Sequence, residues 1–418
     1  MIIKGLQQQY YSKIIVLAIC LCIIFLTRCM NKEAKEKNVI SKNKYEDFAG
    51  SVSCQNCHKE ITTGHIHTAH FLTTQPASAN NIKGSFLPGE NVFAFTNRLE
   101  VVMEKRIDKF YQAAYLDGVQ KNAKPFDILV GSGTKGQSYM YWKGNKLFQL
   151  PITYFAPLHQ WSNSPGYPGM VVYNRPITSR CLECHSTYFE KTSEDEIETE
   201  EFDRTKIIYG VDCEKCHGPA ASHVKYHQQN PNDKNGKFII NTGKLSRQQN
   251  LDLCTLCHGG NLTKSKPSFT FKAGEYLANY FVTDSAKKFA DRIDVHGNQY
   301  GLLSSSKCFL NSQMTCSSCH NSHENERNNI TLFSQRCMHC HNASEGNFCK
   351  VKVDHNINIQ NNCIDCHMPR QLSMSIAVFL QGDEVPTPAL LRTHLLKIYP
   401  DETKKYIEEM KKQPQRNK

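Results

Sequence analysis

One short stretch, CEKCHGPAASHVKYH from Cys213 to His227, combines two cysteines with three histidines. The two thiols are separated by two residues, and His217 follows the second thiol directly. Residues in this order can clasp zinc, form a redox-active disulfide, or attach a c-type haem whose iron the histidine binds. A single copy of the spacing leaves all three chemistries open.

The pattern CxxCH is repeated seven times in the chain, and the repetition favours haem. Chance would supply roughly 0.04 copies in a chain of this composition. Structural zinc needs four ligands, usually from paired CxxC knuckles, and does not require a histidine after every second cysteine. A thioredoxin-like dithiol is a still weaker interpretation. We therefore predict seven covalently attached c-type haems with their iron, bound at Cys54, Cys57, His58, Cys181, Cys184, His185, Cys213, Cys216, His217, Cys254, Cys257, His258, Cys316, Cys319, His320, Cys337, Cys340, His341, Cys363, Cys366 and His367.

The haem motifs are spread unevenly along the chain, and this limits the kinds of fold that can hold them. Six of them lie between Cys181 and His367, about 31 residues per haem. So few residues cannot build an aliphatic core around each cofactor, so the porphyrins must supply much of the buried apolar surface. We predict a mostly α and irregular, haem-packed multihaem cytochrome fold whose apoprotein folds poorly, with a β-rich insertion between the first and second haem motifs.

The composition and hydropathy pattern along the chain suggest six segments. They are an export or lipoprotein signal (1–29), a charged tether (30–48), the first haem segment (49–85), the β-rich insertion (86–178), a six-haem domain (179–395) and a C-terminal helix or tail (396–418). The insertion contains aromatic and β-branched runs such as QSYMYW and LFQLPITYF, separated by glycine and asparagine.

Three features within these segments have ordinary interpretations. GSGTKG, Gly131 to Gly136, matches GxGxxG but precedes a strand pattern, so we predict a glycine-rich hairpin and no dinucleotide site. Trp142 and Trp161 are expected to pack in a core. The acidic run from Glu190 to Asp203 reads as a surface loop, a solvated face in preference to a docking site for a basic partner.

The N-terminus has the layout of an export signal. Lysines precede the apolar run Ile14 to Leu26, which is short for a membrane span, and Cys29 follows it directly. The region resembles a bacterial lipoprotein signal with Cys29 as the acylated residue, although Arg28 departs from that pattern. We expect export to the periplasmic or cell-surface side of a bacterial membrane, with lipidated Cys29 or the apolar segment as the attachment, or a cleaved soluble form.

The formal charge of +11 does not indicate nucleic acid binding. Seven haems bring about fourteen propionates, so the holoprotein would carry about −3 with ferrous iron and about +4 with ferric iron. The basic residues therefore mostly balance cofactor charge, and we expect redox partner proteins and a membrane as partners, with no nucleic acid.

Eleven histidines lie outside the proximal positions, and each haem iron has a sixth coordination position to fill. A second imidazole there gives a low-spin centre whose geometry changes little on reduction, as electron transfer requires. On this reasoning His223 or His227 is a distal ligand to a neighbouring haem.

Several stretches resemble a known multihaem family: YEDFAGSVSCQNCHKE with TAH after it, CEKCHGPAASH, CSSCHNSH and CIDCHMP. It contains the tetrahaem cytochrome that accepts electrons from hydroxylamine oxidoreductase, and is related more distantly to cytochrome c nitrite reductase. The resemblance covers 46–72 and 179–395 in pieces and leaves the insertion out. It implies distal iron ligation by His70, His223 and His323, and sequence context adds His296, His355 and His394.

Seven haems need seven distal ligands, and the six just named leave one short. His227, His65 or His67 could fill the gap, while His159 lies in the insertion and His339 inside its own CMHCH motif. Nitrite reductases of the superfamily carry a CxxCK motif, and none occurs here. Cys308 and Cys349 lie outside every haem motif, and in an oxidising compartment a structural disulfide is the default for them, with iron or second-metal ligation as the alternative.

These observations predict an exported heptahaem c-type cytochrome that transfers electrons through closely packed, mostly bis-histidine haems. The alternative is a multihaem reductase or oxidase of a small nitrogen or sulfur compound, acting at one haem with an open distal site. A third class is an assembly subunit whose haems only connect it to a partner. The sequence identifies no substrate acid or base.

Overall fold

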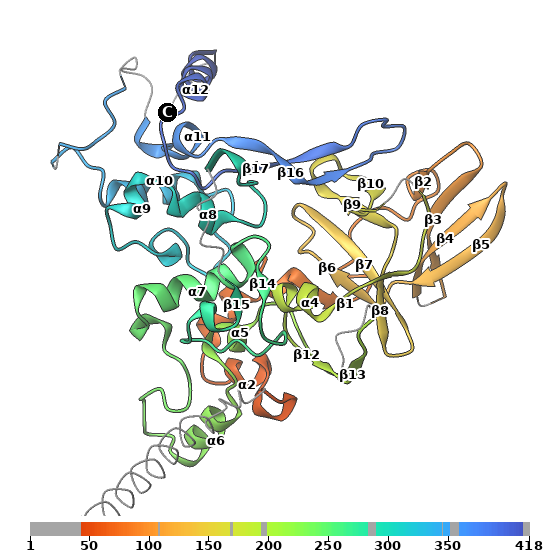
Figure 1. Cartoon of the computed structure of the whole chain (residues 1–418), viewed down its shortest axis with the longest axis horizontal. Helices are drawn as coiled ribbons and strands as arrows, with labels where there is room; N and C mark the ends of the chain where they lie inside the picture. Colours follow the sequence, from red (N-terminus) through yellow and green to blue (C-terminus); the bar gives the residue numbers. More distant parts are fainter. Residues whose placement is uncertain are drawn as a thin grey trace, which may run out of the picture. The chain divides into compact units, whose positions relative to one another are not determined.

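The segment between the first two CxxCH motifs forms most of the antiparallel sheet in the computed structural model of the chain (Figure 1). The structure describes residues 43–107, 109–167, 170–193, 199–282, 290–344, 346–351 and 359–412, all in one compact unit. The predicted signal, most of the predicted tether and His355 lie outside the described residues.

Two antiparallel sheets make up this β-rich region. The larger one joins β1 (Thr74–Pro76), β6 (Ile128–Val130), β7 (Gly136–Lys143), β8 (Lys146–Gln149) and β11 (Arg175–Pro176), with β9 (Ile152–Phe155) and β10 (Gln160–Asn163) added through β7. The smaller is the meander β2 (Val92–Ala94), β3 (Leu99–Arg106), β4 (Lys109–Leu116) and β5 (Val119–Pro125). Asp117 and Gly118 form the two-residue β4–β5 turn with positive φ at both positions, the geometry that Asp-Gly favours in hairpins.

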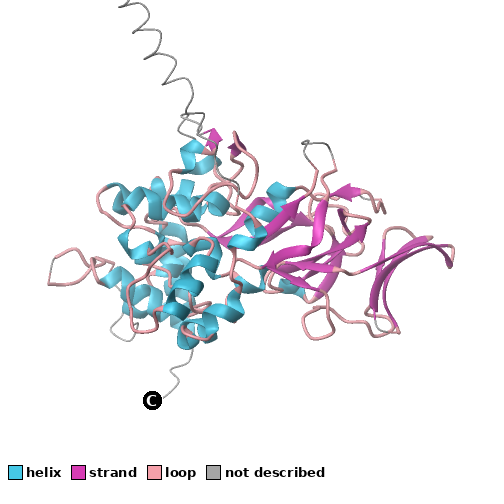
Figure 2. Cartoon of the chain, turned by 90° about the horizontal axis from the view of Figure 1, so that it is seen from below, coloured by secondary structure: helices cyan, strands magenta, loops and turns pink. Residues whose placement is uncertain are grey.

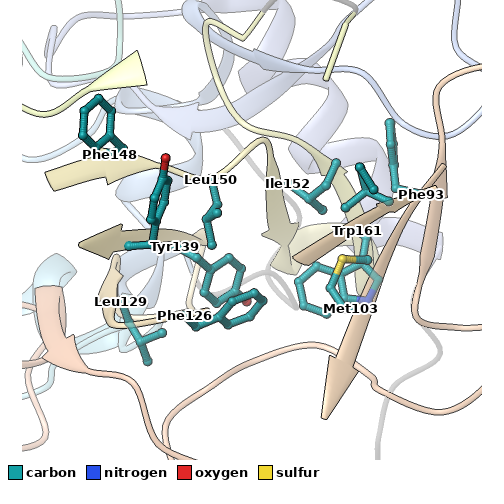
Figure 3. Close-up of a cluster of buried hydrophobic side chains, with 12 residues drawn as sticks. Phe93, Met103, Phe126, Leu129, Tyr139, Phe148, Leu150, Ile152 and Trp161 are labelled. Atoms are coloured by element: carbon teal, nitrogen blue, oxygen red, sulfur yellow. The ribbon is translucent and has the colours of Figure 1, made fainter. Parts of the chain in front are cut away.

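An apolar cluster lies within the β-rich region (Figure 3). The Phe126 and Tyr139 rings stack at 4.3 Å between centroids, and Trp161 donates a hydrogen bond from Nε1 to the Ser85 carbonyl. Leu150 and Ile152 are fully buried in the same cluster. Burying one such side chain is worth about 1.5–3 kcal/mol. The predicted packing role of Trp161 is confirmed, and Trp142 packs against a second buried cluster.

The GSGTKG segment is the turn of an antiparallel hairpin between β6 and β7, as predicted. Gly131 has a φ of 99°, and a Cβ there would meet the Gly136 carbonyl oxygen at 2.6 Å. The glycines therefore serve the turn, and a strand follows where a dinucleotide site would need a helix.

Helices gather apart from these strands, and most are short (Figure 2). The α-helices of the described residues are α2 (Ser51–Gln55), α3 (Lys59–His65), α4 (Ser179–His185), α5 (Cys213–His217), α6 (Ala221–Gln229), α7 (Arg247–His258), α8 (Gln299–Ser304), α9 (Lys307–Leu310), α10 (Ile330–Met338), α11 (Ile364–His367) and α12 (Pro400–Lys412). Six CxxCH motifs overlap one of these helices, and the motif at Cys316 begins with a 3₁₀ turn. The predicted terminal helix is confirmed as α12, with Tyr406, Ile407 and Met410 half-buried on one stripe.

Antiparallel pairing also occurs beyond the predicted insertion. The hairpin β12 (Ser186–Lys191) with β13 (Phe202–Tyr209) takes in both ends of the acidic run, so the prediction of a plain surface loop there was wrong. Buried Tyr188, Phe189 and Phe202 anchor it. The two remaining pairs are β14 (Thr263–Lys264) with β15 (Phe281–Val282), and β16 (Arg370–Val378) with β17 (Thr387–Arg392). The fold thus combines helices with substantial antiparallel sheet.

The β16–β17 hairpin is one connection between the two regions (Figure 1), and the second buried cluster, which packs Ile128, Met140 and Leu147 against Leu182 and Phe269, is another. Val378 and Ala389 pack with Phe155 at the end of β9. Asn163 donates its backbone N–H to the Phe379 carbonyl at 3.2 Å, and its side-chain Oδ1 accepts the Phe379 N–H at 2.7 Å. Within the described residues, no helix has the length and apolar character needed to cross a membrane.

Candidate haem-binding site

In each CxxCH motif the two cysteines and the histidine lie on one turn of backbone. The backbone N–H of the histidine donates to the backbone carbonyl of the first cysteine. This bond is 2.8 Å long from His58 to Cys54 and 3.0 Å from His320 to Cys316, and it also forms in the motifs of His341 and His367. Because this is the i to i−4 spacing of a helical turn, the first thiol and the imidazole share a face. That local geometry fits a porphyrin attached by thioethers and bound by the same histidine.

Five proximal imidazoles have Nδ1 engaged by a neighbouring group. The partners are the Thr73 hydroxyl for His185 (3.1 Å), the Ile240 carbonyl for His217 (2.9 Å), the Gln299 amide oxygen for His258 (3.1 Å), the Asn347 carbonyl for His341 (3.3 Å) and the Lys397 carbonyl for His367 (2.9 Å). A carbonyl partner fixes Nδ1 as the protonated nitrogen and leaves Nε2 free for iron. Sequence reasoning missed these supporting groups, and four of the five lie 23 or more residues away along the chain, Asn347 being the exception.

Three proximal histidine rings each have the ring of a second histidine at a nearly equal distance. The ring centroids of His258 and His70 lie 6.2 Å apart, those of His217 and His323 6.0 Å, and those of His320 and His394 6.2 Å. With metal–nitrogen bonds of about 2 Å, two imidazoles on opposite sides of one iron have ring centres about 6 Å apart. His296 is an electrostatic neighbour of His185. The side chains present therefore fit haem iron.

Burial keeps several of these imidazoles neutral. Desolvation, with a smaller contribution from nearby histidines, lowers the pKa of His70, His185 and His394 to about 4. Part of the His70 side chain is exposed to solvent, but the surrounding protein atoms still remove enough water from the ring to lower its pKa. The Nδ1 atom of His394 is buried without a partner among the described residues. Neutral imidazole is the form that binds a metal.

Attachment cysteines of different motifs are neighbours. Their thiols lie close enough to shift each other's pKa in the pairs Cys54–Cys213, Cys184–Cys257, Cys254–Cys316 and Cys337–Cys363. These contacts join the first motif to the third, the second to the fourth, the fourth to the fifth, and the sixth to the seventh.

His65 is a further buried histidine in this region. Its ring centroid lies 6.4 Å from that of His323, but its own nitrogens face Asp212 (3.6 Å from Nε2) and the Ser322 carbonyl (3.4 Å from Nδ1). His217 is therefore the partner of His323, at an interplanar angle of 13°. His67 is exposed, and His159 is held by the Tyr154 hydroxyl in the β-rich region.

The other predicted distal residues are not brought to a proximal ring. His223 lies 4.6 Å from His227 between centroids and contacts the Lys237 carbonyl through Nδ1. Within the described ranges, the rings of His58, His341 and His367 contact no second histidine. His339 is the C-cap residue of α10, in the middle of the sixth motif.

Cys308 and Cys349 are both free thiols. The disulfide expected for them was wrong, since neither sulfur has a bonded partner. Burial raises the pKa of the Cys308 thiol, whereas Cys349 is exposed.

Comparison with known proteins supports a c-type cytochrome. Residues 170–218, which contain the second and third motifs, match the family model described as cytochrome c554 and c-prime. The outer cell wall cytochrome OcwA, a crystal structure, superimposes with a TM-score of 0.52 and 16% identity over 86% of this chain and 81% of that chain. No curated protein matches the chain significantly.

The two findings together support a multihaem c-type cytochrome with covalently bound haem. At 16% identity the likeness to OcwA shows the fold alone. Residues 86–178 make up more than a fifth of the chain, so a likeness that covers 86% of it includes part of the β-rich region.

Proposed function

We propose that the protein is an exported heptahaem c-type cytochrome that transfers electrons through closely packed, mostly bis-histidine haems. The observation that carries this proposal is the repeated spacing of about 6 Å between a CxxCH histidine and a histidine from another part of the chain. When bound, haem supplies the one-electron chemistry, and the protein holds the iron and tunes its potential through ligands and burial.

Three assignments follow the ring separations, and that of His296 follows its electrostatic interaction with His185. In this proposal His70 serves the haem of His258, His296 that of His185, His323 that of His217, and His394 that of His320. Helix α6, which carries His223, packs against the 3₁₀ turn Tyr45–Asp47 just before the first motif, so His223 is proposed for the haem of His58. His355 remains proposed for the sixth or seventh motif.

The adjacent thiols support electron transfer between haems. A cysteine binds its porphyrin directly, so contacts between thiols of different motifs bring the corresponding haem edges together. The contacts connect the second, fourth and fifth motifs in one series, and pair the first with the third and the sixth with the seventh.

Location and partners complete the proposal. We propose export and attachment to a membrane through lipidated Cys29 or the apolar N-terminal segment, with redox proteins as donor and acceptor. The name of the structural neighbour, an outer cell wall cytochrome, is in keeping with export. The sequence resemblance to the tetrahaem partner of hydroxylamine oxidoreductase supports an electron-transfer role.

Mass spectrometry of the mature protein tests the central claim. A host that matures c-type cytochromes should yield a mass with seven haem additions that survive acid–acetone extraction. A mass with six or fewer additions, or with zinc in their place, would remove the proposal of seven haems.

A second function is favoured by the three motifs that lack a histidine partner within the described ranges, those of His58, His341 and His367. Two ligands, His223 and His355, are proposed for these three irons. An iron with an open position could bind a small nitrogen or sulfur compound, and the remaining haems would store its electrons. Electron paramagnetic resonance separates the two functions, because a wholly low-spin oxidised protein that ignores nitrite and sulfite excludes the enzyme.

A further inference from the structure

Gln299, at the start of α8, differs from the other groups that support a proximal histidine. Its amide oxygen lies 3.1 Å from His258 Nδ1. Of the other four Nδ1 partners in the described part of the chain, three are backbone carbonyls, and the fourth is the Thr73 hydroxyl. A hydroxyl either donates or accepts, whereas an amide oxygen only accepts. Gln299 therefore supplies a side-chain carbonyl that a substitution can remove.

A second contact determines which end of the amide faces His258. Gln299 Nε2 lies 3.4 Å from the Val295 backbone carbonyl and donates to it. Because an amide nitrogen only donates, this contact turns Oε1 toward the imidazole and makes His258 Nδ1 the donor. Nε2 of His258 is then the nitrogen that is left for iron.

The segment that carries Gln299 is itself attached to the fourth CxxCH motif. The N–H of Gly260, two residues after His258, donates to the Gly297 carbonyl at 2.7 Å. The Asn298 side chain accepts a backbone N–H from the first turn of α8 at 3.0 Å and so caps that helix. Gln299 is half-buried. These backbone contacts hold its amide in place beside the imidazole.

We propose that Gln299 is a positioning residue, which sets the orientation and the electron donation of His258 and thereby the reduction potential of the haem that His258 binds. An acceptor on Nδ1 makes the imidazole a stronger electron donor to iron, and a stronger donor favours the ferric form. This inference rests on the proposed function, because Gln299 acts on electron transfer only through that iron.

The position of the fourth motif gives this potential its importance. Helix α7, which ends in the motif, packs against α4 of the second motif and against the 3₁₀ turn of the fifth, Cys316–Ser318. Arg180 of α4 donates to the Leu256 carbonyl inside the fourth motif at 3.0 Å, and Cys184 Sγ lies 3.8 Å from the same oxygen. A potential set by Gln299 therefore acts on transfer toward both neighbouring motifs.

Optical redox titration of the haem-loaded protein tests the proposal with two substitutions that should have opposite effects. Gln299→Met removes the acceptor at similar side-chain length, so the potential of about one haem in seven should rise. Gln299→Glu supplies a carboxylate, a stronger acceptor, so that potential should fall. The expected fall is about tenfold in the ferric-to-ferrous ratio at a fixed potential, which is about 59 mV for one electron. Loss of packing alone would move both variants in the same direction.

Asn298→Asp is the matched control for charge. It adds the same negative charge one residue away and keeps the helix cap, because aspartate caps a helix as well as asparagine does. Its shift should be smaller than that of Gln299→Glu, since its carboxylate accepts from α8 and not from His258.

Electron paramagnetic resonance gives a second measurement. The low-spin ferric signal depends on the angle between the two axial ring planes, which is 64° for His258 and His70. Gln299→Met releases the His258 ring and should change the signal of one haem, whereas Gln299→Glu should keep it.

The haem content of each protein, measured by mass spectrometry, separates the two ways to fail. A parent without haem removes the proposed function and this inference with it. A loaded parent whose variants shift in the same direction, or not at all, overturns the role of Gln299 alone. If Gln299→Met does not load haem, the comparison of Gln299→Glu with Asn298→Asp decides, and equal shifts in these two overturn the proposal.

Discussion

The β-rich region and the haem-motif region of this chain differ in how much apolar surface their own side chains bury. Among the described residues, eighteen apolar side chains between Phe93 and Tyr167 are buried, against twelve between Cys213 and His367, a stretch about twice as long. The β-rich region can therefore be stable through its own side chains. The haem-motif region has short helices and few buried apolar residues, as expected where porphyrins contribute the core.

Buried polar groups show the same contrast. In the haem-motif region they tie segments together: Glu214, the second residue of its CEKCH motif, accepts backbone N–H groups from Ala49, Gly50 and Ala220 at 2.8–2.9 Å. In the β-rich region the Gln112 side chain of β4 bonds the Ile152 backbone of β9 in both directions and so joins the two sheets. Carboxylates within motifs thus fasten distant loops, a task that strand pairing performs in the sheets.

Withholding haem should have the largest effect. We expect the chain made without c-type maturation to lose ordered structure in 179–395 while the β-rich region keeps its sheets. Limited proteolysis with mass spectrometry should then leave a protected fragment that contains 92–163. Equal resistance of both regions in the haem-free chain would show that the haem-motif region has a sufficient core of its own.

Truncating a side chain in the core of the β-rich region should have the second largest effect. Leu150→Ala removes a fully buried side chain, which should lower the free energy of unfolding of that region by about 2–5 kcal/mol. Emission from Trp142 and Trp161, the two tryptophans of the chain, reports urea unfolding there, and the haem Soret band reports the other region. Val119→Ala, at an exposed position, is the control. Equal loss in both signals would mean that the regions share one core.

In the proposed heptahaem protein, loss of one distal ligand should change about one haem in seven. His70→Ala removes the imidazole 6.2 Å from His258, so the oxidised protein should gain a high-spin resonance for that haem. His67→Ala in the same exposed segment should leave the spectrum unchanged. An unaltered low-spin spectrum in His70→Ala would refute the assignment of His70.

Sequence reasoning worked where a pattern is local. The CxxCH turns, the GSGTKG hairpin, helix α12 and the β-rich character of the segment from Val92 to Asn163 all follow from short-range spacing and turn chemistry. The acidic run misled, because the buried Tyr188 and Phe189 that anchor the hairpin lie just before it and only Phe202 lies within it.

Long-range relations could not be predicted. Nothing near His185 in the sequence indicates Thr73 as the partner of its Nδ1, and nothing near His258 indicates Gln299. Such pairings depend on how separate loops pack together.

The smallest effect should come from the connection between the regions. Asn163→Ala leaves the Phe379 N–H without its 2.7 Å acceptor and removes the 3.2 Å bond from Asn163 Nδ2 to the Tyr167 carbonyl. An unsatisfied backbone donor costs about 1–3 kcal/mol, so the β16–β17 hairpin should hold less firmly to β10. Tryptophan emission and the Soret band should then report thermal transitions that lie further apart than in the parent. Asn122→Ala is the matched control, since the Asn122 side chain makes no hydrogen bond among the described residues. Transitions in Asn163→Ala that stay as close as in the parent would show that the Val378, Ala389 and Phe155 contact couples the regions without this hydrogen bond.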